Sequence, residues 1–278
     1  MVSVLWAGGR LRDPREPVLS GADAGFATGL GVFETCAVVA GGAFALTRHL
    51  DRLAASLRAL DLPAVDEGEV RDAVAAVLAA GGAELGRVRV TVSPGAPGAD
   101  APSLVVTAGP APVRGPAHVV RVPWVRNERS PLAGHKSTSY AADVLALAAA
   151  HRAGGNEALL ANTRGDLCEG TGSNVFVERD GALRTPPLSS GCLPGVTRAL
   201  VLEWAAEAGL PVLEARAGEL PWAVLEDVRR GAAGLALSGS LRGFAGVHAV
   251  EGAAVAPGPL TAAVVELFRA RAGADPDP

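Results

Sequence analysis

Residues 164–198 read RGDLCEGTGSNVFVERDGALRTPPLSSGCLPGVTR and combine a carboxylate with the start of a helix. Glu169 stands among small residues, and the apolar run at 174–177 predicts a strand soon after it. Leu193–Thr197 then opens an amphipathic helix. The first turn of a helix presents free N–H groups at its positive end, and the Thr197 hydroxyl adds another donor, so this end suits a phosphate. The stretch therefore predicts an acid and an anion site within one segment.

A single lysine stands upstream of this stretch. Lys136 lies in the sequence HKSTSY at 135–140, where a loop is predicted to meet a helix, and every other basic residue is arginine or histidine. Arginine stays protonated and cannot form an imine with a carbonyl compound, whereas lysine can. Keeping one lysine in an otherwise lysine-free chain indicates a position that requires an amine.

These three features together fit pyridoxal phosphate. A lysine forms a Schiff base with this cofactor, a carboxylate keeps its pyridine nitrogen protonated, and a helix start takes its phosphate. Each feature alone has a structural explanation: Lys136 as a surface lysine, Glu169 as a turn carboxylate and Thr197 as a helix cap. Arg52 could bind phosphate with two bonds, but on its own it is better explained as a solvated helix arginine. Ser240 follows a predicted buried strand, in a loop that a ligand can approach closely.

Other catalytic motifs are incomplete or missing from the sequence. The glycines of 29–31 and 170–172 do not complete G-x-G-x-x-G, and the sequence contains no Walker A motif or nucleophile elbow. The five histidines show no metal-ligand spacing. We therefore expect no metal site, and nicotinamide and P-loop chemistry are poorly supported.

Composition narrows the class of protein further. The 278 residues are 49% apolar and carry a net charge of −4 with the charges interspersed, which argues against a nucleic-acid partner. The alanine-rich stretches are broken by charged residues, so no membrane span is expected. Three cysteines, Cys36, Cys168 and Cys192, are odd in number and lack metal spacing, which favours a reducing, cytoplasmic compartment.

The predicted elements indicate an α/β protein made of two α+β domains. Strands and helices are found throughout, mostly with hairpin-type connections, which favours two α+β domains over one doubly wound sheet. The first domain is predicted over 1–110, a proline-rich linker over 111–118, and the second domain, which carries the lysine, over 119–278. The tail at 273–278 is expected to fray.

Five motifs in a fixed order carry a resemblance to a known family. They are Gly31-Val32-Phe33-Glu34-Thr35, His49-Leu50-Asp51-Arg52-Leu53, Lys136, Glu169-Gly170-Thr171-Gly172-Ser173-Asn174-Val175-Phe176, and Leu193-Pro194-Gly195-Val196-Thr197-Arg198. The set resembles the class IV, or fold type IV, pyridoxal-phosphate enzymes and covers nearly the whole chain. That family includes branched-chain aminotransferases, D-amino acid aminotransferases and 4-amino-4-deoxychorismate lyase.

The resemblance implies a two-domain fold like that of D-amino acid aminotransferase, a homodimer and a small-molecule substrate. It implies Lys136 as the Schiff-base lysine and proton carrier, and Glu169 as the partner of the pyridine nitrogen. The other cofactor-binding residues that it implies are Arg52, Asn174, Val196, Thr197 and Ser240. The substrate-binding residues assigned with it are Phe33, Tyr140 and Arg242.

Within the family, Phe33-Glu34-Thr35 is similar to the lyase and unlike the Phe-Glu-Gly of branched-chain aminotransferases. Thr35 falls where the lyase has a threonine that is thought to assist proton transfer. The sequence therefore predicts conversion of 4-amino-4-deoxychorismate to 4-aminobenzoate and pyruvate, in folate synthesis or a specialised pathway. The alternative is a transaminase that acts on branched-chain amino acids, D-amino acids or another primary amine with a 2-keto acid.

Two positions depart from the family pattern. Relatives of the lyase and D-amino acid types often carry Arg-Gly after the strand that ends near Val92, and that arginine can bind a substrate carboxylate. Here Ser93-Pro94-Gly95 takes its place, so either another arginine, with Arg242 as the candidate, binds the carboxylate, or the substrate differs. Leu30 stands where aspartate is usual.

Overall fold

The computed structural model describes residues 2–113 and 115–278, so Met1 and Arg114, which fall in the predicted first domain and linker, lie outside the described residues. The chain forms two compact units. The first comprises residues 1–113, 135–140 and 272–278, and the second comprises 114–134 and 141–271. The first break in the chain therefore falls within the predicted linker.

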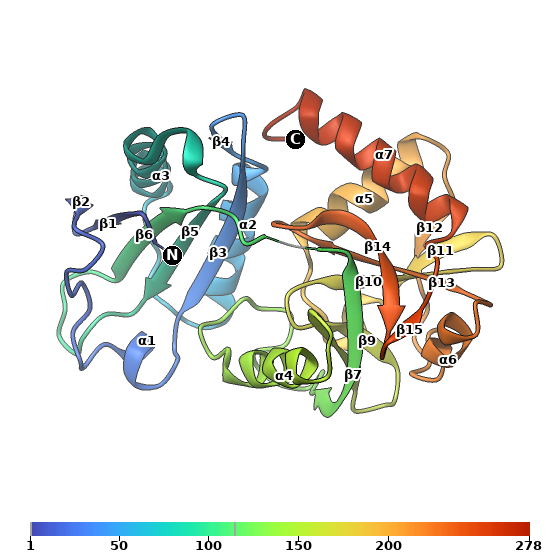
Figure 1. Cartoon of the computed structure of the whole chain (residues 1–278). Coiled ribbons are helices and arrows are strands. Elements are labelled where there is room, and N and C mark those ends of the chain that lie inside the picture. The colour runs from blue at the N-terminus through green and yellow to red at the C-terminus, as the bar shows by residue number, and fades with distance from the viewer. Residues whose placement is uncertain (1, 114) are drawn as a thin grey trace. The chain divides into compact units, whose positions relative to one another are not determined.

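The first unit is built on a six-stranded antiparallel sheet with the order β2-β1-β6-β5-β3-β4 (Figure 1). Its strands are β1 (Val4–Ala7), β2 (Arg10–Arg12), β3 (Val32–Val39), β4 (Gly42–Ala43), β5 (Arg87–Ser93) and β6 (Ser103–Gly109). A short helix, α1 (Ala24–Ala27), precedes β3, and η1 (Gly82–Glu84) precedes β5. Buried and half-buried side chains alternate along β5 and β6, as expected where one face of a sheet is covered.

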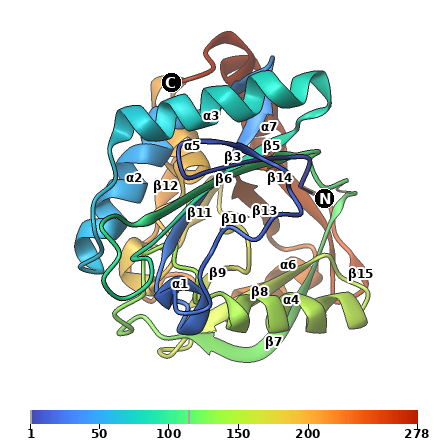
Figure 2. The ribbon, with the colours of Figure 1, turned by 90° about the vertical axis from the view of Figure 1, so that its left-hand side faces the viewer.

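Two helices cover that face, α2 (Leu46–Ala59) and α3 (Glu67–Gly81), as Figures 1 and 2 show. The predicted leucine stripe of α2 is buried at Leu50, Leu53 and Leu57. These side chains share one core with the buried valines of β5 and with Cys36 of β3. Apolar burial of this kind is worth about 25 cal/mol per Å² and outweighs the weak intrinsic stability of each helix.

The lysine segment belongs to the first unit, whereas the sequence placed it in the second domain. The reason is backbone pairing with the chain just before and within β3. Phe33 N donates to Lys136 O at 2.9 Å, and Thr138 N donates to Gly31 O at 2.8 Å. These bonds join residues about a hundred positions apart, so local pattern alone could not reveal them.

Residues 272–278 also belong to the first unit. The sequence predicted that the tail at 273–278 frays, but hydrogen bonds hold its end against α2. Helix α2 follows Ala45, whose φ of 54° is left-handed and whose side chain provides no cap. Asp277 supplies the missing cap: its carboxylate accepts from Thr47 N at 2.8 Å and from Thr47 Oγ1 at 2.6 Å. Arg48 Nε donates to Pro278 O at 2.7 Å. The tail therefore satisfies the exposed donors at the start of α2.

We expect Asp277→Ala to lower the free energy of unfolding by about 1 kcal/mol, the typical value of an N-cap. Urea unfolding measures this difference. Asp100→Ala is the matched control, because Asp100 is also exposed and its replacement removes the same charge. Equal stability of the two variants would show that the Asp277 carboxylate contributes nothing to the stability of α2.

The second unit is built on a mixed sheet with the strand order β12-β11-β10-β13-β14-β7-β8-β9, with β15 added to β14. Pairs β7–β8, β7–β14 and β11–β12 are parallel, and the other pairs are antiparallel. Its strands are β7 (Ala117–Arg126), β8 (Glu157–Asn162), β9 (Leu167–Gly170), β10 (Asn174–Arg179), β11 (Ala182–Thr185), β12 (Val212–Glu214), β13 (Gly234–Gly239), β14 (Gly243–Val250) and β15 (Ala253–Ala254).

Four α-helices and one short 3-10 helix accompany this sheet in the part of the chain that the structure describes. They are α4 (Ala141–Arg152), α5 (Val196–Glu207), α6 (Val224–Arg229) and α7 (Pro259–Ala274), with η2 (Leu188–Ser190) before α5. Small residues on α4, such as Ala146 and Ala150, lie against β7 and β8. The mixed α/β architecture confirms the predicted fold class. No helix among the described residues is long and apolar enough to span a membrane.

Candidate active site

The start of β3 holds the backbone of the lysine segment close. Thr138 Oγ1 and Ser139 Oγ both donate to Gly29 O, at 2.8 and 3.0 Å. A Cβ at Gly29 would lie 2.8 Å from Ser139 Oγ, and one at Gly31 would lie 2.8 Å from Val92 O. Gly29 also has a φ of +70°. Both positions therefore require glycine, which explains the Gly-Leu-Gly sequence before β3.

Two aromatic rings surround the lysine amine. Lys136 Nζ lies 4.6 Å from the ring centre of Phe33 and 5.7 Å from that of Tyr140. The two rings meet edge to face, with centres 5.5 Å apart. Ring faces attract a cation and also exclude water from one side of the amine. The structure thus brings together three predicted site residues, Lys136, Phe33 and Tyr140.

Thr35 and Arg89 share the sheet face on which Phe33 lies. Phe33 and Thr35 are two residues apart on β3, and Thr35 pairs with Arg89 of β5. The Arg89 guanidinium carbon lies 3.6 Å above the Phe33 ring centre, and Arg89 Nε donates to Thr91 Oγ1 at 3.2 Å. Burial is the main cause that lowers the pKa of Arg89 from its ordinary value. Among the described residues, no carboxylate forms an ion pair with this guanidinium.

On the opposite face of the same sheet, Glu34 forms a buried network with α2. Its carboxylate accepts from Arg52 Nε at 2.8 Å and from Arg52 Nη2 at 2.7 Å, while His49 Nδ1 lies 2.6 Å from Oε2. Burial alone would raise the pKa of Glu34, but Arg52 and His49 outweigh it and hold the pKa at about 2. Arg52 is thus positioned by Glu34, and its contact with a phosphate remains a prediction.

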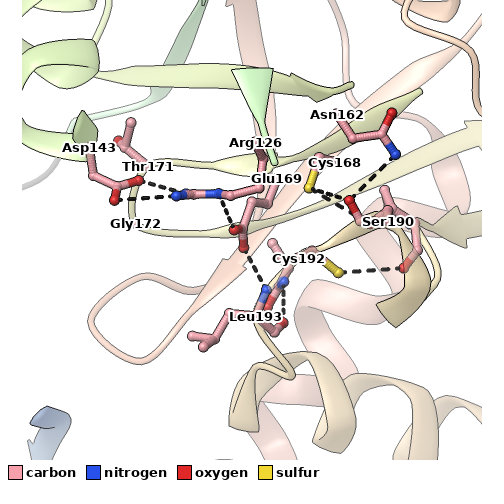
Figure 3. A network of polar contacts seen from close by, with 12 residues as sticks. Arg126, Asp143, Asn162, Cys168, Glu169, Thr171, Gly172, Ser190, Cys192 and Leu193 are labelled. Atoms are coloured by element: carbon pink, nitrogen blue, oxygen red, sulfur yellow. Dashed lines mark hydrogen bonds and ion pairs between the residues drawn. The ribbon is translucent and has the colours of Figure 1, made fainter. Parts of the chain in front are cut away.

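In the second unit, both oxygens of Glu169 are held in place (Figure 3). Glu169 lies on β9 with 9% of its side chain exposed. Oε1 forms an ion pair with Arg126 Nε at 3.0 Å, and Oε2 accepts from Leu193 N at 2.9 Å. A carboxylate fixed in this way has a defined direction and can accept a further N–H from a ligand.

Asn174 links Glu169 to the start of α5. Its Nδ2 donates to Leu193 O at 2.8 Å, so both side chains bind the backbone of Leu193. Helix α5 begins at Val196 after Gly195, which provides no side-chain cap. A Cβ at Gly195 would collide with Asn174 Oδ1. The first N–H groups of α5 and the buried Thr197 hydroxyl are donors of the kind that suits an anion, and phosphate binding there remains a prediction.

A loop beside Glu169 is held by a buried carboxylate that the sequence analysis missed. Glu157 accepts from the backbone N of Thr171 and Gly172, from Thr171 Oγ1 and from Ser173 Oγ. A Cβ at Gly239 would lie 3.0 Å from Gly172 O, which places the end of β13 against this loop. Ser240 follows directly, and Arg242 N donates to Gly239 O in the same turn at 3.0 Å.

Two buried cysteines lie beside Glu169. Cys168 precedes Glu169 on β9, and Cys192 precedes Leu193. Burial raises the pKa of Cys168 far above its ordinary value and raises that of Cys192 to about 11, with the charge of Glu169 adding to both shifts. Both thiols stay protonated at neutral pH, so they fill space beside Glu169.

Each unit thus gathers part of the predicted site. The first holds Lys136, Phe33, Tyr140, Thr35 and Arg52, and the second holds Glu169, Asn174, Val196, Thr197, Ser240 and Arg242. The sequence analysis did not find Arg89, Arg126, Asp143 and Glu157. Arg89 lies on a predicted strand, and its charge there was the available signal. Arg126 was expected in a polar loop after a strand, whereas the structure places it at the end of β7.

Comparison with known proteins agrees with these features. A family model described as amino-transferase class IV matches residues 31–250. A bifunctional aminodeoxychorismate lyase / D-amino acid transaminase of Mycobacterium tuberculosis is 31% identical over 229 residues, which cover 72% of this chain and 77% of that protein. A Methanocaldococcus jannaschii protein, provisionally named a branched-chain-amino-acid aminotransferase, is 33% identical over 223 residues, covering 76% and 77%.

A solved structure resembles the whole chain. A hypothetical aminotransferase from Mycobacterium tuberculosis, in its PLP-bound form, aligns with a TM-score of 0.86 and 29% identity. The alignment covers 96% of this chain and 98% of that one.

Proposed function

The chain belongs to the class IV aminotransferase family of pyridoxal-phosphate enzymes, and we propose that it is a lyase that converts 4-amino-4-deoxychorismate to 4-aminobenzoate and pyruvate. The similarity to a bifunctional lyase and D-amino acid transaminase supports this choice, as does Thr35 after Phe33-Glu34. The observation that carries it is the partly buried guanidinium of Arg89 close to Phe33, whose ring also lies near the lysine amine.

The residues present fit pyridoxal phosphate. The amine of Lys136 would bind its aldehyde carbon, and the carboxylate of Glu169 would accept from its ring nitrogen. The uncapped start of α5, with Val196 and Thr197, matches a phosphate in charge and in donors. Ser240 would add a hydroxyl to the phosphate, Arg52 a guanidinium, and Asn174 would fix the backbone that leads into α5. When bound, the cofactor supplies a ring that draws electrons from the substrate carbon bearing the amine.

The side chains of the protein then have distinct tasks. With the cofactor held there, the amine of Lys136 would take the proton from the substrate carbon that bears the amine and return it to the departing enolpyruvyl group. The Thr35 hydroxyl assists this transfer. The ring carbon–oxygen bond breaks, pyruvate leaves, and the remaining ring becomes aromatic. The reaction therefore needs no second substrate.

Arg89 favours a substrate that carries a carboxylate. A guanidinium that stacks on an aromatic ring keeps its edge available for a planar acid group, which it can bind with two hydrogen bonds. A branched aliphatic side chain would bury this cation without an acidic partner, at a cost of several kcal/mol. Aminodeoxychorismate has two carboxylates. We propose that Arg89 binds one of them, in place of the missing Arg-Gly motif, and that Arg242 stays a second candidate.

The alternative is a transaminase. The similarity to the archaeal protein supports this reading, and Arg89 would then favour a dicarboxylic amino acid as one of the substrates. Lys136 and Glu169 would have the same roles, because both reactions begin with proton removal from the same carbon. We also propose that the protein is a homodimer, because the family resemblance implies one. The three free thiols support a place in the cytoplasm.

An assay with pyridoxal phosphate and no keto acid separates the two functions. We expect aminodeoxychorismate to yield 4-aminobenzoate and pyruvate in equal amounts. Conversion of the cofactor to its amine form by an L- or D-amino acid, without 4-aminobenzoate, would instead establish the transaminase and refute the lyase.

Arg89→Gln tests how the substrate is held. We expect it to raise KM for aminodeoxychorismate by about 10- to 100-fold, since a charged hydrogen bond is worth about 1.5–3 kcal/mol, with a smaller change in kcat. Arg87→Gln is the matched control, because Arg87 lies on the same strand and the same face, two residues away. If both variants change KM equally, Arg89 does not bind the carboxylate.

A further inference from the structure

Glu169 is the end of a chain of three charges. Arg126 lies between Asp143 and Glu169, as Figure 3 shows. Its Nη2 lies 2.6 Å from Asp143 Oδ1, and its Nε lies 3.0 Å from Glu169 Oε1. Only 5% of the Asp143 side chain and 9% of the Glu169 side chain are exposed. Two buried carboxylates therefore share one guanidinium.

The network keeps a net charge of −1. Burial alone would lower the pKa of Arg126, but the charges of Glu169 and Asp143 raise it above its ordinary value, so the guanidinium stays charged. A pair of Arg126 and Glu169 alone would be neutral and would attract a cation weakly. Asp143 restores one negative charge, which a cationic ligand at Glu169 can balance.

The arrangement of the chain supports this role for Asp143. It lies in the first turn of α4, at the edge of the network away from Leu193. Among the residues that the structure describes, the hydrogen bonds and ion pairs of Asp143 are all with Arg126. Arg126 therefore links the Asp143 carboxylate to Glu169.

We propose that Asp143, through Arg126, strengthens the hold of Glu169 on a protonated pyridine nitrogen. Asp143 is thus a positioning residue that sets the negative potential at Glu169 and does not itself touch the cofactor. This inference rests on the proposed role of Glu169. The proposed effect depends on a single atom of the ligand, the ring nitrogen. It can therefore be distinguished from a general effect of Asp143 on the fold.

The test compares two ligands that differ at that atom. The apoprotein is titrated with pyridoxal phosphate and with its 1-deaza analogue, in which carbon replaces the ring nitrogen. Tryptophan fluorescence reports binding, since the chain has four tryptophans. The variant is Asp143→Asn, which keeps the shape and a hydrogen-bond acceptor for Arg126 but removes the charge.

We expect Asp143→Asn to lower the affinity for pyridoxal phosphate about tenfold, because it removes one charge near a partly buried site. The affinity for the analogue should change by no more than about twofold. Glu251→Gln is the matched control. Glu251 and Glu226 share Arg121 on the same strand, β7, and Arg229 also pairs with both, so this variant removes one carboxylate charge from another arginine–carboxylate cluster. It should change neither affinity.

Four results would overturn the inference. An equal loss of affinity for both ligands in Asp143→Asn would show that Asp143 only stabilises the fold. No loss of affinity for either ligand would show that the charge of Asp143 does not affect binding at Glu169. Wild-type protein that binds both ligands equally would refute the role of Glu169 as well. A wild-type preference that survives in Asp143→Asn would refute this inference alone and leave the proposed function standing.

Discussion

Replacing Lys136 with alanine should lower turnover by at least about 10⁴-fold, since it removes covalent attachment as well as a proton transfer that alone contributes about 10²–10⁴-fold. The fold should survive, because the bond from Phe33 N to Lys136 O uses the backbone and is kept by alanine. The visible absorption of lysine-bound cofactor should disappear together with activity. Lys136→Arg should be equally inactive, because arginine keeps the charge but cannot form the bond.

Arg129→Ala is the matched control for this experiment. Arg129 is exposed in the loop before the lysine, and its loss removes the same charge without touching the rings around Lys136. Borohydride reduction of the wild type followed by peptide mapping should place the cofactor on Lys136. Full activity in Lys136→Ala, or cofactor attached elsewhere, would disprove the assignment of the chain's single lysine.

Glu34→Ala should lower the free energy of unfolding by about 3–5 kcal/mol, the usual effect of breaking a buried ion pair. Glu34 is 1% exposed, and its loss would leave Arg52 and His49 buried beside a cavity without their carboxylate. Urea unfolding measures this directly. Glu67→Ala removes a carboxylate from an exposed pair with Arg71 and should cost at most about 0.5 kcal/mol. A similar cost for both variants would contradict the structural role of Glu34.

The same network makes the free energy of unfolding depend on pH. Arg52 and His49 hold the pKa of Glu34 at about 2, below its ordinary value of 4.5. Its stabilisation is therefore complete above about pH 4.5 and is lost as the pH falls toward 2, by about 3 kcal/mol at 1.36 kcal/mol per pKa unit. Glu34→Gln lacks this carboxylate. The stability difference between wild type and Glu34→Gln should shrink over that range and stay constant above it.

The sequence predicted the parts of the site that lie in continuous motifs. Glu169, Asn174 and Thr197 fall in one stretch, and the structure joins them through Leu193. Lys136 could be found because it is the only lysine. These residues carry chemistry that few residue types can provide, so residue identity alone was informative.

Residues that act through tertiary contacts could not be predicted. Arg126 and Asp143 are 17 positions apart, and they meet Glu169 only because β8 pairs with both β7 and β9. A register shift between Arg121 and Val125 sets where Arg126 falls, and no local pattern marks it. Glu34 was assigned to a motif, yet its bond to His49 depends on how α2 packs on β3. A charged residue on a strand indicates that such a network exists, but it does not show which residues pair with it.

The two units are interleaved along the chain, which passes between them four times, after residues 113, 134, 140 and 271. During synthesis the ribosome therefore completes nearly all of the second unit before residues 272–278 can cap α2 in the first. The cap that Asp277 provides can therefore form only after residues 141–271 of the second unit have been made. Neither unit is one continuous stretch of the chain, so a single truncation cannot separate one unit from the other.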